Sequence, residues 1–83
     1  MVVKYFSWIK ENIGKSEEQI IIPNDIKNVD QLINYLKEKD QKYNLIFEKK
    51  KLIKVAVNKT YSSFDTKVCN NDEVAFFPPV TGG

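Results

Sequence analysis

The chain has 83 residues, 42% of them hydrophobic, with no histidine and one cysteine. A chain of this length is expected to form one domain, residues 1–83, with little room for a pocket that encloses a substrate, so we do not expect an ordinary enzyme. The absence of histidine excludes Ser-His-Asp and Cys-His catalytic arrangements and histidine-containing zinc sites, and we expect no metal centre. The net charge of +2, from 13 basic and 11 acidic residues, is too mild to indicate nucleic-acid binding, which needs a concentrated basic face.

The cysteine content and the hydropathy pattern bear on the cellular compartment. Cys69 is the single cysteine and has no internal partner for a disulfide, so nothing indicates an oxidising compartment. We interpret it as a small buried hydrophobic residue rather than a reactive thiol. No apolar run approaches membrane-spanning length, and the N-terminus lacks the layout of a signal peptide. We therefore expect a cytoplasmic protein that does not contact a membrane.

The N-terminal region reads as strand, turn and strand. Residues 2–9 are rich in β-branched and aromatic side chains and predict a strand. Residues 10–15 predict a short helical turn that stops at Gly14. Residues 18–22 predict a second strand, which Pro23 ends.

An amphipathic helix is predicted over residues 29 to about 39. Asn28 is the expected N-cap, and Gln31, three residues later, has the spacing of a capping box. The apolar positions of this segment follow the i, i+3, i+4, i+7 pattern of one helix face. They are Val29, Leu32, Ile33 and Leu36. We expect this face to pack on the sheet.

The C-terminal half contains further strand candidates separated by turns. The strand candidates are residues 45–47, 52–57 and 73–77, and the turns are residues 48–51, 58–59 and 70–72. Strands on both sides of one main helix indicate an α+β fold, in which a mixed sheet is covered on one face by that helix.

Strand alternation predicts an exposed aromatic patch. In the first strand Lys4 and Phe6 share a side, and Lys4 marks that side as solvent-facing because an unpaired buried lysine is costly. In the last strand Glu73 similarly shares its side with Phe77. If the two strands are neighbours, the aromatic rings gather on one exposed face, which usually marks a partner site; a loop over the rings would instead bury them. The predicted patch comprises Phe6, Trp8, Tyr61 and Phe77.

The last six residues, 78–83, predict an extended tail. Pro78 and Pro79 fix φ and favour an extended path, so they form a stiff segment after the last strand. Gly82 and Gly83 follow, and without a Cβ atom they make a thin thread that fits a narrow active site on another protein. Alternatively, residues 78–83 are a frayed chain end without a function.

These residues carry a family resemblance. Residues 71–83, NDEVAFFPPVTGG, closely resemble the C-terminus of the molybdopterin synthase small subunits, the MoaD-type sulfur carriers of the ubiquitin-like ThiS/MoaD family. The likeness extends to residues 56–60 and 63–65 and to the N-terminal strand with Lys10, Glu11 and Gly14. It covers most of the chain and is strongest from residue 55 onward.

The resemblance implies a ubiquitin-like β-grasp fold in which the first and last strands lie parallel. It also implies that a MoeB-type enzyme uses ATP to adenylate the Gly83 carboxylate, which then becomes a thiocarboxylate. This group would donate sulfur to cyclic pyranopterin monophosphate (precursor Z) in molybdenum-cofactor biosynthesis. The chain itself would bind no cofactor and would be a non-catalytic carrier.

The implied partner is a large catalytic subunit of the MoaE type, in a heterotetramer of two small and two large subunits. The residues expected at the site are the reactive Gly83, the thin Gly82, and the partner-binding residues Phe6, Lys10, Tyr61, Phe77, Pro78, Pro79, Val80 and Thr81. Two of these, Phe6 and Phe77, are expected at the centre of the contact.

Other functions stay open at this point. The same chemistry could serve thiamin thiazole formation or tRNA thiolation, although the segment FFPPVT, residues 76–81, argues against the thiazole carriers. A ubiquitin-like modifier would instead join Gly83 to lysine side chains. A plain interaction module would be unaffected by deletion of the tail.

Overall fold

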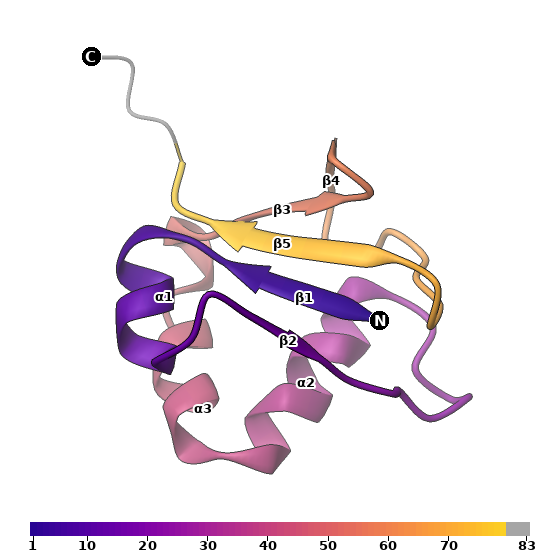
Figure 1. Cartoon of the computed structure of the whole chain (residues 1–83), viewed down its shortest axis with the longest axis horizontal. Helices are drawn as coiled ribbons and strands as arrows, with labels where there is room; N and C mark the ends of the chain where they lie inside the picture. The colour runs from indigo at the N-terminus through magenta and orange to yellow at the C-terminus, as the bar shows by residue number, and fades with distance from the viewer. Residues whose placement is uncertain (80–83) are drawn as a thin grey trace.

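The computed structural model describes residues 1–79 and shows a five-stranded mixed sheet with its helices on one face (Figure 1). The strand order is β2-β1-β5-β3-β4. The strands are β1 (Val2–Tyr5), β2 (Glu17–Gln19), β3 (Lys54–Val57), β4 (Thr60–Ser62) and β5 (Glu73–Phe77). The helices are α1 (Ser7–Ile13), α2 (Val29–Lys39), α3 (Gln41–Phe47) and the 3-10 turn η1 (Lys50–Leu52).

The last strand lies in the middle of the sheet. β5 pairs in parallel with β1, where Val3 lies opposite Val74, and antiparallel with β3, where Val55 lies opposite Phe76. This parallel pairing of the first and last strands, with α2 across the sheet, is the β-grasp arrangement that the resemblance implies, so the predicted fold is confirmed.

Helix α2 has the predicted bounds and the predicted apolar face. The Asn28 side chain accepts a hydrogen bond from the Gln31 N–H at 2.9 Å, which confirms the N-cap. The Gln31 side chain reaches one residue further than in a standard capping box and accepts from the Lys27 N–H. Its four apolar residues are all buried against the sheet: Val29, Leu32, Ile33 and Leu36.

Aromatic rings join the sheet to the helices in the core. The Phe76 ring lies edge-on to Phe47 of α3, with ring centroids 5.0 Å apart, and nearly parallel to the Tyr5 ring at 6.4 Å. All three side chains are at most 3% exposed. Burial of this size is what allows a short chain to hold a stable fold.

The first strand ends earlier than predicted. β1 stops at Tyr5, and Ser7 adopts a left-handed φ of 56°, which breaks the strand alternation and starts α1. Gly14, with φ of 90°, caps this helix as predicted. β2 is likewise shorter than residues 18–22, because Ile22 N–H bonds to the Asn70 side chain instead of a neighbouring strand.

The predicted strand at residues 45–47 is wrong, because these residues belong to α3. The Asp40 side chain caps this helix by accepting from the Lys42 N–H. Tyr43, Ile46 and Phe47 have the i, i+3, i+4 spacing of a helix face and are buried. A short apolar run such as this fits a helix or a strand equally well when it is read alone.

The second half of the chain otherwise follows the prediction closely. β5 has the predicted bounds, and the expected turn is formed by Asn58 and Lys59, both with positive φ. β3 begins at Lys54, two residues later than predicted. Cys69 is exposed, which corrects the expectation that it is buried. None of the described helices has the length and apolar character needed to cross a membrane.

Candidate docking face

The described part of the tail leaves the sheet from its central strand. Phe77, the last residue of β5, lies opposite Lys54 of β3. Pro78 and Pro79 follow, both half-buried; we call them the neck. Neither proline has an N–H for another ladder hydrogen bond, so pairing stops at Phe77. The chain therefore enters the tail from the middle of the sheet. The remaining predicted tail residues, Val80, Thr81, Gly82 and Gly83, lie outside the described residues.

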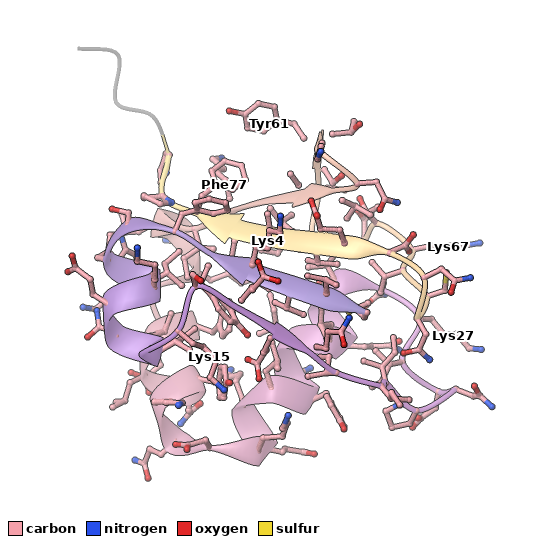
Figure 2. The ribbon with its side chains drawn as sticks, in the orientation of Figure 1. Lys4, Lys15, Lys27, Tyr61, Lys67 and Phe77 are labelled. Atoms are coloured by element: carbon pink, nitrogen blue, oxygen red, sulfur yellow. The ribbon has the colours of Figure 1, made fainter. Side chains whose placement is uncertain are left out.

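The sheet has one face that none of the helices within residues 1–79 covers, which we call the outer face (Figure 2). Along β5 the buried side chains of Val74 and Phe76 alternate with the half-buried Glu73, Ala75 and Phe77. The helices pack on the Val74 side, so the Phe77 side is the outer face. The alternation predicted for this strand is confirmed.

An aromatic pair stands on the outer face. The rings of Tyr61 and Phe77 meet edge to face, with centroids 5.5 Å apart and an interplanar angle of 70°. Tyr61 belongs to β4 and lies opposite Ala56 of β3. Because Ala56 is small, the Tyr61 ring can reach across β3 to Phe77. Tyr61 is 73% exposed, so a partner protein could cover most of its surface.

Phe6 lies at the end of the same face but outside the strand. Its backbone is extended, with φ of −129° and ψ of 155°, and its N–H donates to the Phe76 carbonyl at 3.2 Å. Its side chain is 48% exposed. Among residues 1–79, the ring partner of Phe77 is Tyr61 and not Phe6. The centre of the aromatic patch is therefore shifted toward β4 from the predicted Phe6 and Phe77 pair.

Trp8 does not lie on the outer face as predicted. It is half-buried in α1, packs against the core, and has the Lys49 ammonium 5.8 Å from its ring centre. The left-handed Ser7 turns the chain away from the strand direction before Trp8 is reached. Lys10 is exposed on the same helix. Since β1 and β5 are parallel, α1 begins at the end of the sheet where the neck leaves β5 (Figure 1).

An ion pair occupies the other side of the outer face. Lys4 Nζ lies 3.3 Å from Glu73 Oε1, and both side chains are about one-third exposed. Strand alternation predicts that both residues face solvent, but it does not predict their pairing. The pairing depends on the parallel register. Glu73 lies opposite Val2, which is two residues from Lys4 on the same side of β1. Such a pair contributes little to stability in solvent.

A second polar cluster, which the sequence analysis missed, holds the edge strand β2. One carboxylate oxygen of Glu18 accepts hydrogen bonds from the Tyr5 and Tyr43 hydroxyl groups, both at 2.6 Å. Lys15 Nζ lies 3.5 Å from the other oxygen. The cluster joins β2 to β1 and α3. No spacing rule links residues 5, 18 and 43, so only the folded chain reveals it.

The cluster shifts the ionisation of its members. Burial raises the pKa of Glu18, but hydrogen bonds from Tyr43 and Tyr5 and the charge of Lys15 outweigh it, so the net pKa is lowered. Burial and the Glu18 carboxylate raise the pKa of Tyr5 and of Tyr43 well above the ordinary tyrosine value. The cluster is therefore a carboxylate held by two neutral phenols, and it indicates a structural role.

Metal-binding geometry is not found in the part of the chain that the structure describes. Within residues 1–79, no three Cys, Asp or Glu side chains gather in a way that could hold a metal ion. The candidate functional site thus consists of the outer face and the neck that leaves it.

Comparison with known proteins gives the family. The model of the ThiS family matches residues 3–83. The chain is 40% identical over 81 residues to the molybdopterin synthase sulfur carrier subunit of Haemophilus influenzae, covering 98% of this chain and 96% of that relative.

Solved structures agree with the fold. A Pyrococcus furiosus protein described as molybdopterin converting factor, subunit 1, superposes with a TM-score of 0.75 at 31% identity, over 95% of each chain. The small archaeal modifier protein 1 of Haloferax volcanii superposes with a TM-score of 0.74 over 96% of this chain and 97% of its own, but at 21% identity it supports the fold alone. The chain belongs to the ThiS family.

Proposed function

We propose that this chain is the sulfur carrier subunit of a molybdopterin synthase. The observation that carries the proposal is its 40% identity, over nearly its whole length, to a relative of that name. The Gly82 and Gly83 ending and the neck that leaves the centre of the sheet agree with it. In this role the chain supplies sulfur, and the catalytic groups belong to the partner.

The proposed chemistry takes place at the Gly83 carboxylate. A carboxylate resists substitution because its leaving group would be oxide. Attack of a carboxylate oxygen on the α-phosphate of ATP forms an acyl-adenylate and releases pyrophosphate. A sulfur nucleophile such as hydrosulfide then attacks the acyl carbon, AMP leaves, a proton is released, and a thiocarboxylate remains. Its sulfur attacks a carbon of the cyclic pyranopterin monophosphate precursor, and water then hydrolyses the acyl–sulfur bond, which leaves the sulfur on the precursor and returns Gly83 to a carboxylate. Two such transfers complete the dithiolene.

The outer face is proposed to hold the large catalytic subunit. The aromatic pair Tyr61 and Phe77 and the exposed Phe6 offer rigid apolar surface of the kind that anchors protein interfaces. The neck begins directly after Phe77, so docking at this face aims the tail into the partner. Lys10, at the same end of the sheet, is proposed to help the contact. We propose a heterotetramer of two small and two large subunits.

The test uses the transfer step alone. The chain is prepared with a chemical thiocarboxylate at its C-terminus, mixed with the large subunit and precursor, and molybdopterin formation is measured. A matched variant that ends at Gly82 retracts the reactive carbon by roughly 3.3–3.6 Å. Misplacement by about 1 Å already costs on the order of a hundredfold in rate, so this variant should form almost no product. Wild-type yield from it would refute the role of Gly83.

A ubiquitin-like modifier is one alternative, because the Gly82 and Gly83 ending would serve it equally well. A modifier would pass its activated Gly83 to a lysine amine instead of to sulfur. Isopeptide-linked conjugates in cells, absent when Gly83 is deleted, would favour that function. A carrier for thiamin thiazole or tRNA thiolation would form the same thiocarboxylate but leave the pyranopterin precursor unchanged in the transfer assay.

A further inference from the structure

The middle of the outer face is lined by two alanines. The strand register places Lys4, Ala75, Ala56 and Tyr61 in one row across β1, β5, β3 and β4. Ala75 and Ala56 carry only a methyl group, whereas the side chains at both ends of the row are long. We call these two residues the alanine floor. The Tyr61 and Phe77 rings stand at one side of the floor and Lys4 stands at the other (Figure 2).

Charge is distributed unevenly around the floor. On the β2 side, Glu17 lies opposite Lys4, and Lys4 is already paired with Glu73. On the β4 side, Lys54 and Lys59 are exposed, and within residues 1–79 neither ammonium group lies within salt-bridge distance of a carboxylate. Lys54 lies opposite Phe77 and Lys59 lies in the turn between β3 and β4, so within the described residues this edge of the sheet carries unpaired cations, while the β1 and β2 edge is balanced or acidic.

We propose that the outer face receives one bulky apolar side chain of its protein partner on the alanine floor, with partner carboxylates facing Lys54 and Lys59. The inference rests on the proposed function, because it names the chemistry of the surface to which the carrier docks. An apolar anchor beside Tyr61 and Phe77 would displace water from the edge-to-face pair and bury most of the exposed Tyr61 ring.

The two parts of the proposal act on different rate constants. An apolar side chain of the partner on the alanine floor mainly slows dissociation, since central anchors carry much of the binding free energy. Charges at the rim mainly steer association, and this effect weakens as salt rises. The same electrostatic asymmetry fixes the orientation of the partner, because its acidic edge must lie over β3 and β4.

The floor is tested with substitutions that leave the core untouched. Ala75→Leu fills the floor, and Gln19→Leu is its matched control, since Gln19 lies opposite Val2 on the exposed edge strand β2, away from the floor. Binding of the large subunit to the full chain is measured by surface plasmon resonance. We expect Ala75→Leu to weaken binding about thirtyfold, mainly through faster dissociation, and Gln19→Leu to bind as wild type. Should Ala75→Leu fail to fold, Ala56→Leu fills the same floor.

The charged rim is tested by reversal. Lys54→Glu and Lys59→Glu should each slow association on the order of tenfold at low salt, and the difference should shrink at high salt. Lys27→Glu, an exposed lysine on the loop before α2, should associate at the wild-type rate.

The outcomes separate the inference from the proposed function. The inference would be overturned if the association rate of the wild-type complex does not depend on salt, if neither Lys54→Glu nor Lys59→Glu slows association, and if Ala75→Leu binds as wild type. The proposed function would still stand. If the wild-type chain forms no complex with the large subunit, the proposed function fails and the inference fails with it.

Discussion

Truncation to alanine should have opposite effects at the adjacent residues Phe76 and Phe77. At Phe76 it should mainly lower the stability of the fold, and at Phe77 it should mainly weaken binding of the large subunit. Phe76 is fully buried and contacts Phe47 and Tyr5, so Phe76→Ala should cost about 3–5 kcal/mol of unfolding free energy. Domains are stable by about 5–15 kcal/mol, so this variant should lose a large part of its total stability. Phe77 is half-buried, and its ring partner Tyr61 is 73% exposed. Phe77→Ala should cost about 1–2 kcal/mol, from partial burial and the aromatic pair.

Binding should show the reverse order of effects. Phe77→Ala should weaken the complex with the large subunit by about 2 kcal/mol or more, as central aromatic anchors do. The assays are urea unfolding of both variants and calorimetric titration of Phe77→Ala with the large subunit. The argument is refuted if Phe77→Ala destabilises the fold as much as Phe76→Ala, or if it binds with wild-type affinity.

Three further predictions concern the fold that supports the tail. Leu36→Ala should cost about 2–5 kcal/mol, because the side chain is fully buried; a urea midpoint near wild type would contradict this. Asn28→Ala removes the cap bonded to the Gln31 N–H and should cost about 1 kcal/mol, measured by thermal unfolding. Glu18→Ala should cost on the order of 1–3 kcal/mol for each tyrosine hydroxyl left unpaired. Because the pKa of Glu18 is lowered on folding, its stabilisation is full above the unfolded value of about 4.3 and is lost as pH falls through the lower folded value. The difference in unfolding free energy between wild type and Glu18→Ala should therefore narrow in acid. A difference that is unchanged down to strongly acidic pH would show that the carboxylate does not act through its charge.

The parts of the fold that were predicted correctly depend on local patterns. The Asn28 cap and the apolar face of α2 follow from spacing along one helix. The two sides of β5 follow from strict alternation, with Glu73 marking the solvent side. In both segments each residue's role is set by near neighbours in sequence, so the sequence alone contains the needed information.

The errors arose where tertiary contacts decide. Nothing in the residue type of Ser7 announces a left-handed φ, yet this residue ends β1 and moves Trp8 off the outer face. Residues 45–47 are a short apolar run whose helical state depends on packing of α3 against α1 and α2 and on the contact of Phe47 with Phe76 in the sheet. The apolar pattern could not distinguish the two states.

The candidate site was predicted in part for the same reason. Sequence alternation identified the outer face and Phe77, but the pairing of Phe77 with Tyr61 requires the order of β5, β3 and β4. The ion pair between Lys4 and Glu73 similarly requires the parallel register of β1 and β5. The proposed chemistry of the tail rests on Gly82, Gly83 and the family relationship.

The most direct test of the central claim is the intact mass of the chain after incubation with ATP, the adenylating enzyme and hydrosulfide. We predict a mass increase equal to the replacement of one oxygen by one sulfur, located in the C-terminal peptide and dependent on ATP. An unchanged mass, with the adenylating enzyme shown to be active on a known carrier, would contradict the claim that this chain carries sulfur on Gly83.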